Sequence, residues 1–177
     1  PLTEQYALVI ARAEPENNLE LILKCFSESD SMHLVVIANW FQTRIGKSLK
    51  NRYANQGNLS LICPIFDDPG KLQSYRLNCS LYIHGHSAGG TNPSLVEAMF
   101  SGAPVFAFDN EFNRKTTNNQ AYYFSSEKEL KELLSNKETL DLRTSAKKLQ
   151  QYASEFHTWD KALSEFKQVL ASDENDN

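Results

Sequence analysis

Short apolar runs alternate with helical patterns along this chain, and the alternation restricts its fold more than any other feature. The runs are continuously apolar, which is typical of parallel strands covered by helices on both faces. They occupy residues 6–11, 33–38, 59–65, 79–84, 103–109 and 121–124. Five or six strand-then-helix units predict a doubly wound parallel sheet, that is, a Rossmann-like α/β fold.

Helical patterns fill most of the intervals between these runs. Helices are expected from about residue 17, over 43–55, over 67–78, over 93–101, and over 126–170 with breaks near residue 136 and at 157–158. Asp67 and Asp68 precede Pro69, so we interpret them as helix N-cap residues rather than metal ligands. The segment "DNEFNRKTTNN" (109–119) is expected to be a polar loop.

The length and charge of the chain limit its class. The 177 residues suffice for one domain with a sizeable core, and the net charge of -4 argues against a nucleic-acid partner. We expect one domain over residues 1–171 and a disordered acidic tail over 172–177. No apolar run reaches the roughly 18 residues of a membrane span, and no signal peptide is present, which favours a cytoplasmic location. Because the chain enters a strand soon after Pro1, we expect a fragment of a longer protein.

Cysteine and histidine patterns give no metal site. Cys25, Cys63 and Cys79 lie in apolar segments without a C-x-x-C pair, so we interpret them as reduced core residues. His84 and His86 would share one face of an extended segment, but nothing with suitable spacing joins them as a zinc ligand. A structural or ligand-contacting role is the favoured interpretation for both.

The turn after the fourth run, "HGHSAGGTNPSLVEAM" (84–99), carries the clearest functional signal. Its three glycines allow close backbone approach to a ligand. Asn92 is a good N-cap, and Pro93 fits the first position of a short helix that Gly102 would end. The helix is apolar nearly all round and is expected to be buried. Its start would point free N–H groups at the strand ends, an anion site suited to phosphate.

Glu97 lies one turn into this predicted helix. A buried carboxylate is costly unless it accepts hydrogen bonds. It would therefore either cap the N–H groups of a neighbouring loop or accept hydroxyls of a ligand, such as a ribose diol. A dinucleotide fingerprint would place G-x-G-x-x-G after the first run, where "ARAEPENN" (11–18) stands, and no P-loop is present, so a hydride-transferring enzyme is not expected.

Two segments together resemble a known family. "ARAEPENNLELILKCF" (11–26) and "GGTNPSLVEAMFSGAPVFAFD" (89–109) resemble the C-terminal, donor-binding half of GT-B glycosyltransferases of family 4. The nearest likeness is to the bacterial rhamnosyltransferase-like branch that builds surface polysaccharides. The resemblance spans about residues 8–170, including "FHTWDKALSEFKQVL" (156–170), which is similar to the last helices of the family.

The resemblance assigns roles to the glycine-rich turn. The family carries Glu-x7-Glu here, and its second glutamate matches Glu97, which would bind the nucleotide ribose. The first would fall at Gly89, which has no carboxylate. Backbone N–H groups around Gly90, Thr91 and Asn92 would cradle the sugar and the diphosphate. The helix start, up to Ser94, would stabilise the diphosphate.

The family also places an arginine and a lysine beside the diphosphate. Arg12 matches the arginine, and its planar, bidentate donors suit phosphate. The alternative for Arg12 is a structural ion pair with Glu14 or Glu16. The lysine position holds Asn17, so we hypothesise that another cation supplies that charge. The candidates are Lys47, Lys71 and Arg114.

The remaining implications concern the substrates. The segment after the third run would read the nucleobase, with Ile65 and Phe66 as candidates. The donor would be a UDP, dTDP or GDP sugar, transferred with retention and without a metal cofactor to a glycan acceptor in O-antigen or capsule synthesis. The acceptor, a lipid-linked glycan in this branch, would be held by the chain's own N-terminal domain at the inner face of the cell membrane. Arg12 and Glu97 would act in catalysis, and the fragment alone would be inactive.

Two other functions remain open. The chain would be a non-catalytic nucleotide- or protein-binding module on the same scaffold, since fold does not fix function. A sugar-phosphate phosphorylase on the GT-B fold is the second alternative, which would accept inorganic phosphate and need no nucleotide.

Overall fold

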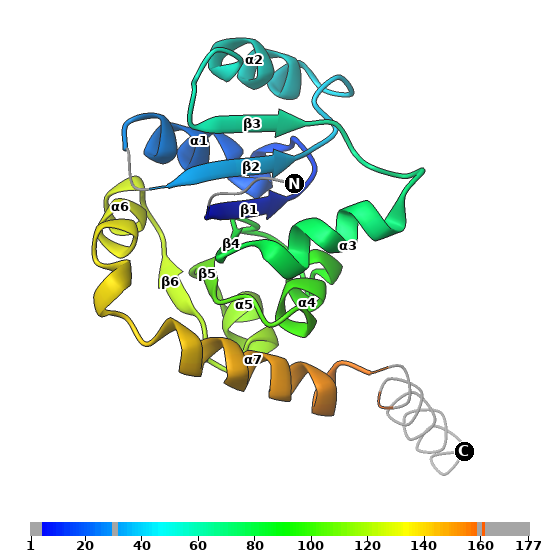
Figure 1. The fold of residues 1–177 in the computed structure, drawn as a ribbon, viewed down its shortest axis with the longest axis vertical. Coiled ribbons are helices and arrows are strands. Elements are labelled where there is room, and N and C mark those ends of the chain that lie inside the picture. Colours follow the sequence, from blue (N-terminus) through cyan, green and yellow to red (C-terminus); the bar gives the residue numbers. More distant parts are fainter. Residues whose placement is uncertain (1–4, 30–31, 159–160, 162–177) are drawn as a thin grey trace, which may run out of the picture.

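The computed structural model describes residues 5–29, 32–158 and 161, and it contains a six-stranded parallel sheet (Figure 1). The strand order is β3-β2-β1-β4-β5-β6, so the order reverses between the central strands β1 and β4. The strands are β1 (Tyr6–Ile10), β2 (His33–Ile37), β3 (Leu59–Ile62), β4 (Leu81–His84), β5 (Val105–Phe108) and β6 (Tyr122–Phe124). The predicted fold class is confirmed, with every apolar run forming a strand.

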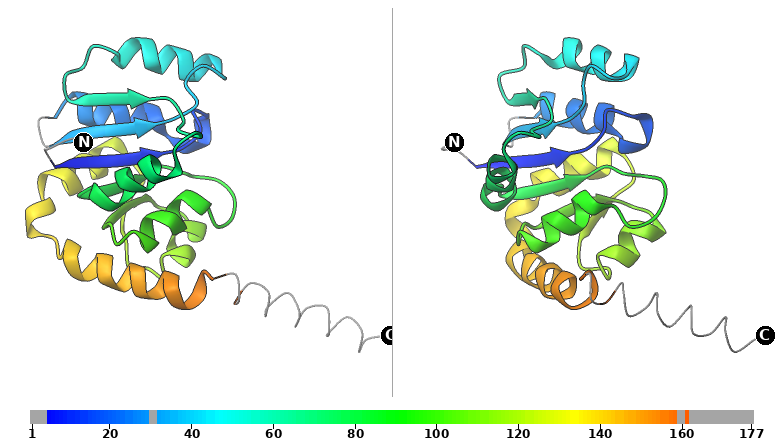
Figure 2. Two further views of the ribbon diagram at one scale, coloured as in Figure 1. Left: turned by 45° about the vertical axis from the view of Figure 1, so that its right-hand side comes forward. Right: turned by 90° about the vertical axis from the view of Figure 1, so that its right-hand side faces the viewer.

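Helices cover both faces of the sheet (Figure 2). They are α1 (Leu19–Ser27), α2 (Arg44–Tyr53), α3 (Pro69–Asn78), α4 (Pro93–Phe100), α5 (Glu111–Thr116), α6 (Glu127–Ser135) and α7 (Leu142–Phe156), with short 3-10 turns at Pro15–Asn17 and Lys137–Thr139. Alternate residues of β1 enter two cores: Ala7 and Val9 pack with α1, α2 and α6, whereas Tyr6 and Leu8 pack with α3, α4 and α7. Burial of both strand faces explains the continuously apolar runs.

The expected polar loop at 109–119 is wrong, because its middle part forms α5. Asn110 caps this helix by accepting a hydrogen bond from the N–H of Asn113 at 2.8 Å. Asn113 and Thr116 are buried although both are polar. The buried positions of this helix are polar and form hydrogen bonds. The sequence therefore shows no apolar periodicity that would predict a helix here.

The two predicted breaks in the last helical region are confirmed. α6 ends at Ser135, and α7 ends at Phe156. The predicted helix beyond residue 161 and the acidic tail at 172–177 lie outside the described residues. In the part of the chain that the structure describes, no helix is long and apolar enough to cross a membrane.

The cysteines differ in their environments. Cys25 is buried and Cys79 is half-buried, but Cys63 is exposed, so the prediction of three core cysteines is wrong for this one. Cys63 directly follows β3, which lies at the edge of the sheet and is only partly covered.

Candidate functional site

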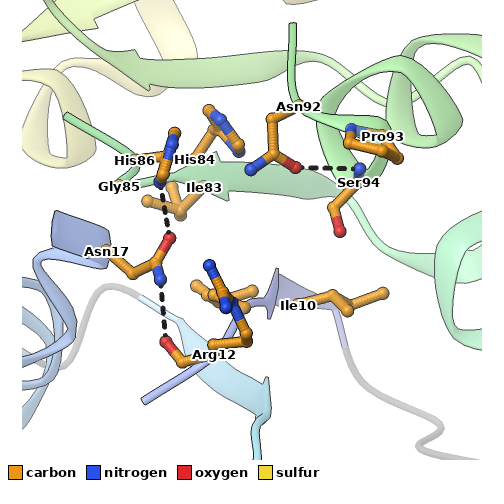
Figure 3. Close-up of a pocket in the computed structure, with 12 residues that line it drawn as sticks. Ile10, Arg12, Asn17, Ile83, His84, Gly85, His86, Asn92, Pro93 and Ser94 are labelled. Atoms are coloured by element: carbon orange, nitrogen blue, oxygen red, sulfur yellow. Dashed lines mark hydrogen bonds between the residues drawn. The ribbon is translucent and has the colours of Figure 1, made fainter. Parts of the chain in front are cut away.

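A pocket of about 270 Å³ opens where the strand order reverses, at the carboxyl ends of β1 and β4 (Figure 3). In open α/β sheets this crevice is the usual place for a ligand. The polar residues that line it come from the loop after β1, the loop after β4 and the start of α4. They are Arg12, Asn17, His84, His86, Asn92 and Ser94.

Two asparagines join the loops on either side of the pocket. Asn17 donates from Nδ2 to the carbonyl oxygen of Arg12 at 3.0 Å, and its Oδ1 lies 3.0 Å from Nδ1 of His86. Asn18 donates from Nδ2 to the carbonyl oxygen of Gly85 at 2.8 Å. Asn17 is only 5% exposed. The residue at the family's lysine position therefore has a structural role here.

Gly85 allows this close approach of the two loops. A Cβ atom at this position would clash with the carbonyl oxygen of Asn17 and would lie 2.8 Å from Cδ1 of Ile22. The need for glycine at this site comes from packing, because Gly85 has no positive φ. Any side chain here would push the β1 and β4 loops apart.

The start of α4 differs from the prediction of several free N–H groups. Pro93 has no N–H, Ser94 N–H donates to Oδ1 of Asn92 at 3.0 Å, and Leu95 N–H donates to the carbonyl oxygen of Asn92 at 3.1 Å. What remains at the pocket is the partial positive charge of the helix start together with the Ser94 hydroxyl and the Asn92 amide. The predicted N-cap at Asn92 is confirmed.

Arg12 combines both of its alternatives. Its side chain is 67% exposed and contacts Glu14 at 3.3 Å and Glu16 at 3.9 Å through Nη2. It also lines the pocket opposite the start of α4. Because exposed ion pairs contribute only about 0–1 kcal/mol, these carboxylates would not compete strongly with a bound anion.

Glu97 is not the buried carboxylate that the sequence suggested. Its side chain is half exposed, and α4 buries only one side, through Leu95, Ala98 and Met99. Glu97 contacts the guanidinium group of Arg76, which is 8% exposed and comes from α3. Its partner is therefore a cation, not the N–H groups of a loop. Glu97 does not line the pocket itself.

The three candidate cations for the missing lysine charge lie outside the lining of the pocket. Arg114 forms two hydrogen bonds to Asp109, at 2.6 and 2.7 Å, and lies 4.2 Å from the centre of the Tyr123 ring. The guanidinium group lowers the pKa of the Asp109 carboxyl. These bonds hold the side chain of Arg114 on Asp109, outside the lining of the pocket.

The other predicted contacts are more scattered. Gly89, Gly90 and Thr91 form an exposed loop that leads to the pocket but does not line it, with Gly89 at φ +75° in the left-handed region. Ile65 packs partly against the core, whereas Phe66 is 81% exposed. The structure does not bring these two residues to the pocket.

Asp68 caps α3 by accepting the N–H of Lys71 at 2.8 Å. The predicted N-cap is thus confirmed for Asp68.

His84 and His86 belong to the pocket wall. His84 is buried, and burial lowers its pKa from 6.5 to about 3. Its Nε2 has no hydrogen-bond partner within the described residues. The two rings lie 6.1 Å apart. Among the described residues no group of three His, Cys, Asp or Glu side chains is arranged to hold a metal ion.

The structural or ligand-contacting role expected for His84 and His86 agrees with their place in the pocket wall, whereas sequence reasoning missed Asn17 as a link between the loops and Arg76 as the partner of Glu97. The position of His86 just after β4 is the one local signal that pointed to the pocket. Arg76 carries no such signal, because it contacts Glu97 across 21 residues of sequence.

The family profile described as "Glycosyl transferases group 1" matches residues 1–156. The chain belongs to this family. No curated protein matches this glycosyl transferase group 1 chain in sequence.

Solved structures share the fold of this group 1 domain at low sequence identity. Anabaena Alr3699/HepE, solved in complex with UDP-glucose, is 15% identical with a TM-score of 0.79, over 96% of this chain and 49% of that one. Sucrose-phosphate synthase from Thermosynechococcus elongatus is 15% identical with a TM-score of 0.78, over 97% and 47%. The pneumococcal O-GlcNAc transferase GtfA, in complex with UDP and GlcNAc, is 14% identical with a TM-score of 0.72, over 94% and 35%. The chain thus spans half or less of the length of these structures.

Proposed function

We propose that this chain is the C-terminal, donor-binding half of a GT-B glycosyltransferase of family 4, in the rhamnosyltransferase-like branch. It would bind a UDP, dTDP or GDP sugar for transfer, with retention, to a glycan acceptor in O-antigen or capsule synthesis. The observation that carries the proposal is the pocket in which Arg12 faces the start of α4 at the reversal of strand order. Membership of the group 1 family supports it.

The diphosphate of the donor would lie between Arg12 and the start of α4. Arg12 is exposed enough to turn from Glu14 and Glu16 and donate two hydrogen bonds to phosphate oxygens. The positive end of α4 and the Ser94 hydroxyl would act from the opposite side. Negative charge grows on the diphosphate as the glycosidic bond breaks, so cationic groups fixed at this place would stabilise the transition state. No metal is required for that role.

Glu97 would accept the ribose hydroxyls. Arg76 contacts its Oε2 and so fixes the carboxylate, while the half-exposed side chain leaves the other oxygen accessible. Backbone groups at Gly89, Gly90 and Thr91 would complete the cradle for the sugar and diphosphate. Ile65 and Phe66 would contact the base, and the exposed Phe66 ring offers an apolar surface for it.

The remaining parts of the reaction would lie outside this chain. The solved structures of similar fold are about twice as long or longer, which supports a second, N-terminal domain in the full protein. That domain would bind the acceptor, a lipid-linked glycan at the inner face of the membrane, so the chain alone would have little or no transferase activity. HepE and GtfA, solved with UDP-glucose and with UDP and GlcNAc, support a nucleotide-sugar donor.

Isothermal titration calorimetry with UDP-glucose, dTDP-rhamnose and GDP-mannose tests the proposal. Saturable binding of at least one donor, competed by the matching nucleoside diphosphate, is the expected result. Binding of none of them would favour the non-catalytic module, and binding of inorganic phosphate or a sugar phosphate without nucleotide would favour the phosphorylase.

A further inference from the structure

Two segments, the start of α5 and the loop after β1, hold His86 at the wall of the pocket. Its carbonyl oxygen accepts hydrogen bonds from Nδ2 of Asn110 at 3.0 Å and from Nδ2 of Asn113 at 2.8 Å, both at the start of α5. Its Nδ1 lies 3.0 Å from Oδ1 of Asn17 in the loop after β1 (Figure 3). Both the backbone and the ring of His86 are therefore fixed in position.

The contact with Asn17 determines which ring nitrogen carries the proton. The carbonyl oxygen of Arg12 can only accept, so the Asn17 atom that faces it must be Nδ2. Oδ1 then faces His86 and can only accept, so Nδ1 of His86 must carry a hydrogen. In the neutral ring, Nε2 consequently presents a lone pair and acts as an acceptor.

Nε2 of His86 faces space next to the glycine-rich loop. It makes no hydrogen bond to the described residues, although the ring is fixed from its other side. A Cβ atom on Gly89 would meet only this Nε2, at 4.0 Å, and the positive φ of Gly89 disfavours any side chain there. A preorganised acceptor thus borders the pocket without a partner among the residues that the structure describes.

We propose that Nε2 of His86 accepts a hydrogen bond from a hydroxyl group of the donor's hexose and thereby helps to select the sugar. The inference rests on the proposed function. The hexose is linked directly to the diphosphate, so a diphosphate between Arg12 and the start of α4 would bring sugar hydroxyls to the wall that His86 forms. Asn17 is then a positioning residue, because it sets the tautomer and the orientation of the ring.

The test compares the affinity for a complete donor with the affinity for its nucleoside diphosphate, using whichever donor binds in the calorimetric panel. The dissociation constant of the nucleoside diphosphate, divided by that of the donor, measures what the sugar contributes to binding. His86→Phe keeps a ring and removes Nε2, so we expect this ratio to fall about three- to tenfold, as for one lost hydrogen bond. The affinity for the nucleoside diphosphate should change less than about twofold, because this ligand lacks the sugar hydroxyl that would donate to Nε2.

Two further variants separate hydrogen bonding from folding. His86→Gln places an amide oxygen near the position of Nε2 and should retain most of the sugar's contribution. Asn17→Leu removes the acceptor that orients the ring and should lose it, with circular dichroism melts to verify that each variant is folded.

Equal losses for donor and nucleoside diphosphate would overturn the inference, as would an unchanged ratio in His86→Phe or a wild type in which the sugar adds no affinity. In those cases the proposed function stands, because the nucleotide still binds. If wild type binds no nucleotide at all, the proposed function fails and the assignment of His86 fails with it.

Discussion

The guanidinium group of Arg76 contacts the carboxylate of Glu97, and this ion pair ties α3 to α4. The two partners differ in environment, since the Arg76 side chain is 8% exposed and that of Glu97 is 50% exposed. Nε of Arg76 is buried without a hydrogen-bond partner in the described chain, whereas Nη2 contacts Glu97, and this contact offsets part of the cost of burying the charge. Glu97 therefore stabilises the fold through Arg76, in addition to the ligand contact proposed for it.

Removal of Glu97 should expose the cost of the buried cation. We expect Glu97→Ala to lower the free energy of unfolding by roughly 1–3 kcal/mol, because a buried charge loses its partner. Adding Arg76→Met removes the orphaned charge and should restore part of that loss. Urea denaturation of the two single variants and the double variant measures the coupling. Simple additivity of the two single effects would contradict it.

A subtler change at the same position tests the ribose contact. Glu97→Gln should weaken binding of the nucleotide sugar by about 1.5–3 kcal/mol, the contribution of hydrogen bonds to a charged group, which is about ten- to a hundredfold. Calorimetry gives the affinity, and a thermal melt shows whether the fold is intact. Unchanged affinity in a folded variant would remove Glu97 from the ribose site.

Arg12 is expected to recognise the diphosphate. Arg12→Ala should weaken binding of UDP or dTDP far more than binding of the bare nucleoside, since only the former carries the phosphate charge. Arg52→Ala is a matched control, because Arg52 pairs with Glu20 at the surface and does not line the pocket. Equal losses for nucleotide and nucleoside in Arg12→Ala would argue against the diphosphate contact.

Acid should destabilise the protein through His84. The folded-state pKa is lowered by burial to about 3, whereas the unfolded chain has the ordinary value of 6.5. Between these values the unfolded state binds a proton that the folded state does not, so the free energy of unfolding falls as the pH drops from 6.5 towards 3. The slope due to this residue approaches 1.4 kcal/mol per pH unit, about one pKa unit's worth of free energy.

Denaturant titrations between pH 7 and pH 4.5 measure this slope. His84→Gln should flatten it, because glutamine does not titrate. The same slope in the variant and in wild type would show that other groups account for the acid sensitivity.

Gly85 tests the close packing of the two loops. Gly85→Ala should cost about 1–3 kcal/mol of stability, typical of overpacking, because its Cβ would clash with Asn17 and crowd Ile22. Gly57→Ala is the control, since a Cβ there meets nothing within 4 Å. Chemical denaturation compares the free energies of unfolding of the two variants. A Gly85→Ala variant as stable as wild type would mean that the loop after β1 can shift to accommodate the Cβ atom.

The sheet could be predicted from sequence because its central strands β1, β2 and β4 are buried on both faces and form unbroken apolar runs. Helices with an apolar stripe or a clear cap, such as α1 and α4, could be predicted equally well. α5 was not, because its buried residues Asn113 and Thr116 are polar and gain stability from hydrogen bonds that no local pattern encodes.

Residues of the site could be predicted from sequence where they come shortly after a strand or cap a helix. Arg12 and Asn92 meet that condition, and the pocket contains both. The exposure of a side chain and its ion-pair partner could not be predicted. Glu97 lies on an apolar helix but is half exposed, and its partner comes from another helix. These properties depend on how α3 packs beside α4, which local sequence does not determine.

The hydrogen bond between Asn17 and His86 joins positions 69 residues apart, and this separation bears on how the protein is made. During synthesis Arg12 and Asn17 emerge long before β4, so until β4 appears β2 is the only one of its two neighbours in the sheet that is available to β1. The pocket then forms only when β4 docks on the open side of β1. A nascent chain that stops before β4 would carry Arg12 without the groups that surround it, so ligand binding would report completion of the central sheet.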